Sequence, residues 1–114
     1  MLERILYAED NDDIQQIAII ALETIGGFTL KICNDGVEAL AAIEEFSPQL
    51  ILLDVMMPNM DGFETCRRLK ANEKTRNIPV IFMSALSEEV DKIKGLELGA
   101  VDYITKPFHA AEVK

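Results

Sequence analysis

Acidic side chains directly follow two apolar segments of this 114-residue chain. Glu9 and Asp10 come after a short apolar run near the N-terminus, and Asp54 comes after a run of four large apolar residues. Two later apolar segments are followed by Ser84 and Lys106. Such runs predict strands buried on both faces of a parallel sheet, and open α/β sheets place their chemistry at the carboxyl ends of these strands. We therefore expect these side chains to meet at one edge of a sheet.

The chemistry of this set is that of phosphoryl transfer. Three neighbouring carboxylates repel one another unless a cation lies between them, and oxygen ligands with high negative charge suit Mg²⁺. The set contains no His or Cys, which argues against zinc. A carboxylate beside Mg²⁺ can attack a phosphoryl group and form an aspartyl phosphate. A lysine, a hydroxyl and backbone N–H groups can neutralise the phosphoryl oxygens, so the set predicts Asp54 as the acceptor, with Lys106 and Ser84 assisting.

Strands and helices are expected to alternate along the chain. The strands are predicted at residues 5–8, 28–33, 50–53, 78–83 and 101–105. Apolar residues at helical spacing predict helices around residues 14–25, 39–46 and 63–69. A fourth helix is predicted from a cap at Ser87 to Leu98, with Val90, Ile93 and Leu96 as a thin apolar stripe and Gly95 inside it. A last helix is predicted to begin near Phe108.

Alternating strands and helices imply a parallel sheet with helices on both faces. The strand at residues 28–33 alternates apolar and polar residues, which suits an edge. Right-handed crossovers then favour a flavodoxin-like, doubly wound α/β fold with five strands in the order 2-1-3-4-5. We predict a single domain over residues 1–114 whose last helix is so short that it looks truncated.

The composition excludes several classes of protein. Hydrophobic residues make up 49% of the chain, which is typical of a globular domain. A net charge of −9 argues against direct binding of nucleic acid, because phosphate binding needs a basic patch. No apolar run is long enough to span a membrane and no signal peptide is evident, so we expect a cytoplasmic protein. Cys33 and Cys66 lack metal-ligand spacing and are expected to be reduced and packed.

Four segments carry a family resemblance. Residues Ala8–Asp10, Leu53–Gly62, Met83–Ala85 and Asp102–Phe108 resemble, in order and spacing, the motifs of receiver domains of two-component response regulators. The resemblance covers essentially the whole chain. It implies a phosphorylation-dependent signalling switch, which accepts its phosphoryl group from a histidine kinase or a histidine phosphotransfer protein. Such a domain catalyses only its own phosphorylation and dephosphorylation and is not an enzyme acting on external substrates.

The resemblance also assigns roles to individual residues. It implies that Asp54 is the phosphoacceptor and that Asp10, Asp54 and the backbone carbonyl of Met56 bind Mg²⁺. Glu9 is expected to act on the metal through water. The motif more often has Asp than Glu at the first acidic position, and Glu9 keeps the charge. Met56 is apolar and bulky where the path of an attacking water is expected, which predicts a long-lived phosphoryl group. Leu86, two residues beyond Ser84, is expected to act in the same way.

The resemblance places a conformational switch on the other side of the site. It implies that Lys106 binds the phosphoryl group and that the Lys106–Pro107 bond is cis. It further implies that Ser84 moves toward the phosphoryl group and that the Tyr103 ring follows. The surface formed by the fourth helix, the fifth strand and the last helix would then change, and it is a plausible homodimer interface. His109 is expected to be a surface residue, because the phosphodonor histidine belongs to the partner.

Three alternative functions remain open from the sequence. A receiver-like scaffold that is never phosphorylated would share most of the motifs. An aspartyl-nucleophile phosphohydrolase usually has a second acid two residues after the nucleophile, where this chain has Met56. A flavin-binding module on the same fold would need a phosphate loop after the first strand, whereas Asn11, Asp12 and Asp13 would repel phosphate.

Overall fold

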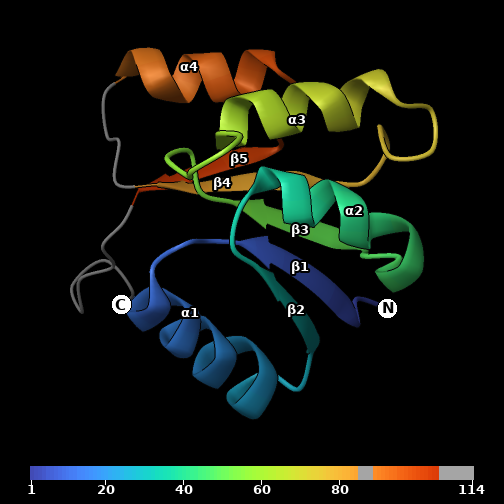
Figure 1. Cartoon of the computed structure of the whole chain (residues 1–114), viewed down its shortest axis with the longest axis vertical. Coiled ribbons are helices and arrows are strands. Elements are labelled where there is room, and N and C mark those ends of the chain that lie inside the picture. Colours follow the sequence, from blue (N-terminus) through green and yellow to red (C-terminus); the bar gives the residue numbers. More distant parts are fainter. Residues whose placement is uncertain (85–88, 106–114) are drawn as a thin grey trace.

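Five parallel strands form one sheet in the order β2-β1-β3-β4-β5 (Figure 1). The computed structural model describes residues 1–84 and 89–105. The strands are β1 (Arg4–Ala8), β2 (Thr29–Cys33), β3 (Leu50–Leu53), β4 (Val80–Ser84) and β5 (Asp102–Thr105). The predicted strand order is confirmed, and β2 lies at an edge as expected. Strand β4 begins two residues later than predicted, because Pro79 has no N–H to donate to the ladder.

Four α-helices connect the described strands. They are α1 (Asp12–Ala18), which continues as a π-helix η1 (Ile19–Ile25), then α2 (Gly36–Phe46), α3 (Gly62–Ala71) and α4 (Glu89–Glu97). The predicted cap Ser87 and the predicted last helix near Phe108 lie outside the described residues. Within the described residues, no helix is both long enough and apolar enough to cross a membrane.

Side chains near the carboxyl edge of the sheet begin three of these helices. The Asn11 side chain accepts the backbone N–H of Ile14 and caps α1. Asp35 and Asp61 cap α2 and α3 by accepting the third following backbone N–H. These caps satisfy N–H groups that have no partner inside the helix. They also fix where each strand-to-helix loop ends, and those loops carry the candidate site.

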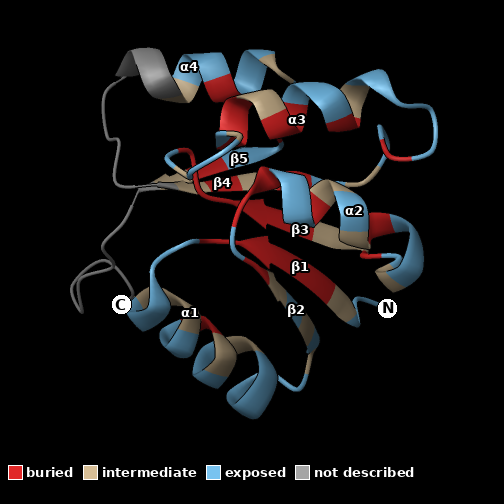
Figure 2. Cartoon of the chain, in the orientation of Figure 1, coloured by how far each residue is buried: buried red, intermediate tan, exposed pale blue. Residues whose placement is uncertain are grey.

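Two apolar layers hold the helices on opposite faces of the sheet, and buried positions concentrate on its central strands (Figure 2). Helices α2, α3 and α4 cover the larger layer, whereas α1 and η1 cover the smaller one. The helix predicted around residues 63–69 is α3, and it packs on the larger layer through the buried Phe63, Cys66 and Leu69. Both cysteines are free and buried, as predicted.

Two residues of the apolar stripe predicted for α4 are not buried. Ile93 and Leu96 are 45% and 48% exposed. The helix instead faces the sheet through Gly95, where an added Cβ would lie 2.9 Å from the Phe82 ring and 3.0 Å from the Tyr103 ring. A side chain at this position would push α4 off β4 and β5. Gly95 is therefore a close-packing residue as well as a residue of low helix propensity.

The first predicted helix also differs in its second half. Residues 19–25 form η1, a wider helix with bonds from each N–H to the carbonyl five residues earlier. The bond from Gly26 N to Ala21 O is 3.0 Å long and closes this helix. Ile17 and Ile20 are 62% and 55% exposed, so the apolar repeat of this segment is only partly used for the core.

Candidate functional site

Three carboxylates meet at the carboxyl edge of the sheet. One oxygen from each of Glu9, Asp10 and Asp54 lies within 4.8 Å of the others. Glu9 and Asp10 directly follow β1, and Asp54 directly follows β3. These strands are neighbours, with Ala8 of β1 paired to Leu53 of β3. The predicted convergence of these three acids is confirmed.

Hydrogen bonds from neighbouring residues hold the Glu9 carboxylate in place. Its side chain is 1% exposed, and the backbone N–H of Asn11 donates to its Oε2 at 3.1 Å. The Tyr7 hydroxyl donates to its Oε1 at 3.4 Å. Burial raises the pKa of Tyr7, and the nearby charges of Glu9 and Asp54 raise it further, so this phenol stays a donor. The Gln15 side-chain amide donates to the Glu9 carbonyl and to Asn34. Glu9 is thus fixed at the inner wall of the site.

Asp54 is 7% exposed, and backbone hydrogen bonds fix the chain at Asp54 and at the next residue, Val55. Its N–H donates to the carbonyl of Ala8 at 3.0 Å, which extends the sheet ladder by one residue. The N–H of Gly62 donates to the carbonyl of Val55 at 2.8 Å. An added Cβ on Gly62 would lie 2.1 Å from the Asp54 carbonyl oxygen. Only glycine allows the start of α3 to approach Asp54 this closely.

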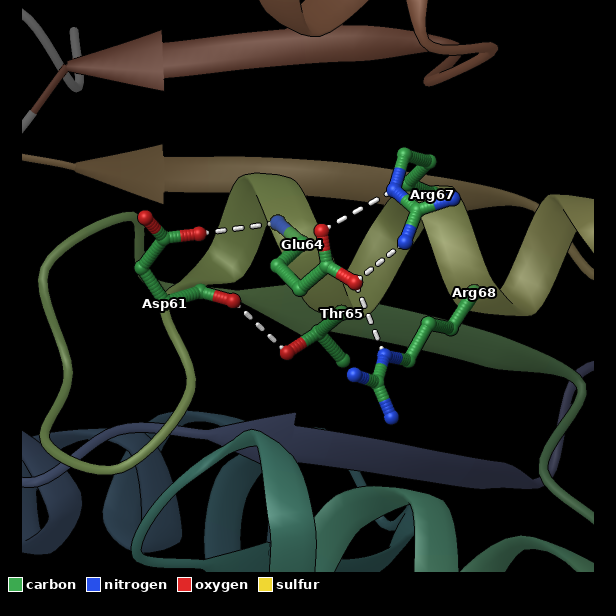
Figure 3. A network of polar contacts seen from close by, with 5 residues as sticks. All are labelled: Asp61, Glu64, Thr65, Arg67 and Arg68. Atoms are coloured by element: carbon green, nitrogen blue, oxygen red, sulfur yellow. Dashed lines mark hydrogen bonds and ion pairs between the residues drawn. The ribbon is translucent and has the colours of Figure 1, made fainter.

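Polar contacts anchor the start of α3 (Figure 3). The Asp61 carboxylate accepts the N–H of Glu64 at 2.8 Å, and its carbonyl accepts the Thr65 hydroxyl at 2.8 Å. Glu64 pairs with Arg67 and Arg68, and these hydrogen bonds lower the pKa of Glu64 to about 2. The two arginines are exposed, and both pair with Glu64 of the same helix.

The remaining predicted residues lie on the adjacent strands or beyond them. Ser84 is the last residue of β4, two strands away from β1 across β3. Tyr103 of β5 is buried and packs beside Phe82, with ring centroids 5.9 Å apart. Met56 follows Asp54 by two residues, and its side chain is 64% exposed. Lys106, the Lys106–Pro107 bond, Leu86 and His109 lie outside the described residues.

The three acids fit a magnesium ion. They offer only carboxylate oxygens, the hard ligands that Mg²⁺ prefers, and no imidazole or thiolate. One of them, Asp10, is exposed, which leaves room for the waters that Mg²⁺ keeps. The donors of Glu9 fix the inner wall in advance, as hydrogen-bonded partners of metal ligands commonly do.

Sequence reasoning missed several residues that build this site. Tyr7 lies in an apolar strand and was not singled out. Its spacing was the available signal, because residues two apart on a strand point to the same face and Tyr7 precedes Glu9 by two. Asp35 and Asn59 contact each other through a bond of 2.6 Å that joins two loops. No local pattern predicts that pair, because the two residues are 24 positions apart. Gly62 is a close-approach residue, since an added Cβ there would lie 2.1 Å from the Asp54 carbonyl oxygen.

The comparisons with known proteins agree with this geometry. The family model of the response regulator receiver domain matches residues 5–114. The chain therefore belongs to the family of receiver domains of two-component response regulators. These domains are signalling switches that interact with histidine kinases and bind Mg²⁺ at an acidic site.

The curated relatives that the chain matches include bacterial transcriptional regulators. It is 40% identical over 112 residues to the DNA-binding master transcriptional regulator RpaA of Synechocystis, covering 98% of this chain and 46% of that protein. It is 42% identical over 113 residues to the alkaline phosphatase synthesis regulator PhoP of Bacillus subtilis, covering 99% and 46%. The chain spans about half the length of the curated relatives it matches.

The fold is shared with crystal structures of the family. A response regulator from Chloroflexus aurantiacus superposes with a TM-score of 0.89 at 29% identity, covering 99% of this chain and 92% of that one. The receiver domain of a Pseudomonas aeruginosa sensor histidine kinase superposes with a TM-score of 0.84 at 31% identity, covering 99% and 92%. That structure is described with a magnesium ion coordinated in the active site cleft.

Proposed function

We propose that Asp54 of this chain accepts a phosphoryl group from a partner histidine and thereby switches the domain between two states. The observation that carries the proposal is the meeting of Glu9, Asp10 and Asp54 within 4.8 Å at the end of β1 and β3. Of the three acids, Asp54 directly follows the central strand β3, and its backbone lies against the start of α3 at Gly62. Asp54 is therefore the acid best placed to carry a phosphoryl group.

The transfer is a displacement at phosphorus. A carboxylate oxygen of Asp54 forms the new P–O bond while the P–N bond to the donor imidazole breaks, and the leaving imidazole takes up a proton. Asp10, Asp54 and the Met56 carbonyl would hold Mg²⁺, and Glu9 would act on it through water. The ion would neutralise charge on the phosphoryl oxygens. Lys106 would supply a second positive charge. The rigid contacts of Glu9 and Asp54 keep these groups in place before the donor arrives.

The response is proposed to pass to β4 and β5. The Ser84 hydroxyl would donate a hydrogen bond to the phosphoryl group, and the Tyr103 ring would follow the movement of Ser84. Tyr103 lies against Gly95 of α4, so a change at this ring would reach α4 directly. This coupling supports α4 and β5 as the output surface, including for pairing of two copies. The switch need only bias a two-state equilibrium by a few kcal/mol.

The proposed phosphoryl transfer also implies a phosphodonor partner. We infer that the donor is a histidine kinase or a histidine phosphotransfer protein. Relatives such as RpaA are named as DNA-binding regulators, and the matched region is about half of each. With a net charge of −9, the region matched here is proposed to supply the switch, and DNA contacts would come from elsewhere.

The proposal is tested by intact mass after incubation with acetyl phosphate and Mg²⁺. The wild type should gain one phosphoryl group, and Asp54→Asn should gain none. Asp61→Asn is a matched control, because it removes a carboxylate seven residues away while Asn still caps α3. This control should be phosphorylated like the wild type, and a chelator should abolish the adduct in both. An unmodified wild type would overturn the proposal and favour an unphosphorylated scaffold.

A further inference from the structure

The loop that follows Asp54 is tied to a second loop by one short polar contact. The Asn59 side-chain amide donates to Asp35 Oδ2 at 2.6 Å. Asn59 has a φ of 67°, in the left-handed region that Asn and Asp tolerate better than most residues. Asp35 belongs to the connection between β2 and α2. The contact therefore joins two of the loops that surround the acidic site.

Asp35 is itself immobilised and charged. It is 6% exposed, and its other oxygen accepts the N–H of Glu38 at 2.8 Å as the N-cap of α2. The Glu38 N–H, followed by the Asn59 amide, holds the pKa of Asp35 below its usual value. Both oxygens of a buried carboxylate are thus used, one for a helix and one for the loop. An acceptor fixed in this way can hold a flexible loop in one position.

The start of α2 also presses on the same loop. An added Cβ on Gly36 would lie 3.0 Å from the Met60 carbonyl and would collide with the Thr65 hydroxyl. The loop is closed at its ends by the Gly62 to Val55 bond of 2.8 Å and holds a tight turn from Met60 N to Pro58 O of 2.7 Å. The Asn59 contact fixes it sideways. Residue 56 lies between the Val55 bond and the Asn59 contact.

We propose that Asp35 and Asn59 are positioning residues for phosphoryl transfer. Their contact holds the backbone of residue 56 beside Asp54 before the metal and the donor bind. Neither side chain touches the reacting atoms in this role. The inference rests on the proposed function, in which the Met56 carbonyl is a metal ligand. Partners that orient metal ligands typically contribute 10–100-fold in metal affinity or activity, so a comparable effect is expected here.

The test is an exchange of donor and acceptor. Asn59→Asp places two carboxylates where an amide now donates over 2.6 Å, so the anchor is lost. Asp35→Asn keeps the cap of α2, and the Asn59 amide can rotate to accept the new N–H, so this variant should lose less than Asn59→Asp. The double exchange, Asp35→Asn with Asn59→Asp, restores the contact with its polarity reversed. Asn77→Asp adds the same charge at an exposed position before β4, at the opposite edge of the sheet, and controls for net charge alone.

Two readouts are measured on each variant: the phosphorylation rate with acetyl phosphate as a function of Mg²⁺, and Mg²⁺ binding by calorimetry. Asn59→Asp should raise the Mg²⁺ concentration for half-maximal rate by roughly 10–100-fold, and the double exchange should return it close to wild type. Urea unfolding of each variant separates a loss of stability from a loss of positioning. A wild-type Mg²⁺ requirement in Asn59→Asp, or a defect that persists in the double exchange, would overturn the inference alone. A wild type that takes up no phosphoryl group would overturn the proposed function with it.

Discussion

Replacing Gly62 by alanine should damage the phosphorylation site through the backbone. The added Cβ would lie 2.1 Å from the carbonyl oxygen of Asp54 and 3.0 Å from the Cα of Val55. Real Cβ contacts essentially never fall under 3.0 Å, so one backbone segment must move by about 0.9 Å or more. The clash is with main chain and not with a flexible side chain. Asp54 and the start of α3 cannot both keep their positions.

The size of the effect follows from this displacement. Overpacking of a well-packed region typically costs about 1–3 kcal/mol of stability. A misplacement of about 1 Å of a reacting group can cost roughly 100-fold in rate. Gly62→Ala should therefore lose about 1–3 kcal/mol in the free energy of unfolding and roughly 100-fold in the rate of phosphorylation by acetyl phosphate. The two losses arise from the same movement of the Asp54 backbone.

A second glycine separates the two losses. Gly27 has a φ of 74°, and an added Cβ there would have nothing within 4 Å. Gly27→Ala should lose about 1–2 kcal/mol through backbone strain and should still be phosphorylated at the wild-type rate. Urea unfolding and a time course of intact mass measure both quantities on each variant. Wild-type phosphorylation of Gly62→Ala would refute the reasoning, as would an equally slow Gly27→Ala.

Two further predictions concern residues at the walls of the site. Burial raises the pKa of Tyr7 above its usual 10.0, so the folded state keeps a proton that the unfolded chain releases above pH 10; stability should fall by about 1.4 kcal/mol per pH unit above that point. Tyr7→Phe should remove this part of the slope in urea unfolding at pH 9 to 11, and an unchanged slope would contradict it. Met56 is 64% exposed and apolar, so Met56→Asn should shorten the phosphoryl half-life by orienting an attacking water. An unchanged half-life would show that residue 56 does not control hydrolysis.

Local patterns were sufficient for most of the fold. The four apolar residues of β3 and the alternation in β2 predicted a central strand and an edge strand, and the sheet order then followed from handedness. The helix around residues 63–69 was identified from its apolar spacing, and its cap Asp61 acts over only three residues. The three acids could be placed together because parallel strands end at one edge. Each of these features is decided within a few residues or by topology.

The features that were missed depend on contacts between distant segments. Helix α4 was expected to pack through Ile93 and Leu96, but it faces the sheet through Gly95, because the rings of Phe82 and Tyr103 occupy the space where a side chain would lie. Amphipathic spacing identifies a helix but does not show which face is covered when the apolar stripe is thin. The apolar spacing of residues 19–25 predicted a helix but not its π-helical form.

The central claim is that Asp54 itself carries the phosphoryl group, and its chemical form can be read directly. The protein is incubated with acetyl phosphate and Mg²⁺, and borohydride then reduces any acyl phosphate to an alcohol before digestion and tandem mass spectrometry. The account predicts reduction at Asp54 to homoserine, and no reduction when Mg²⁺ is chelated. Reduction at Asp10 or Asp61, or a phosphoryl group on His109, would contradict it.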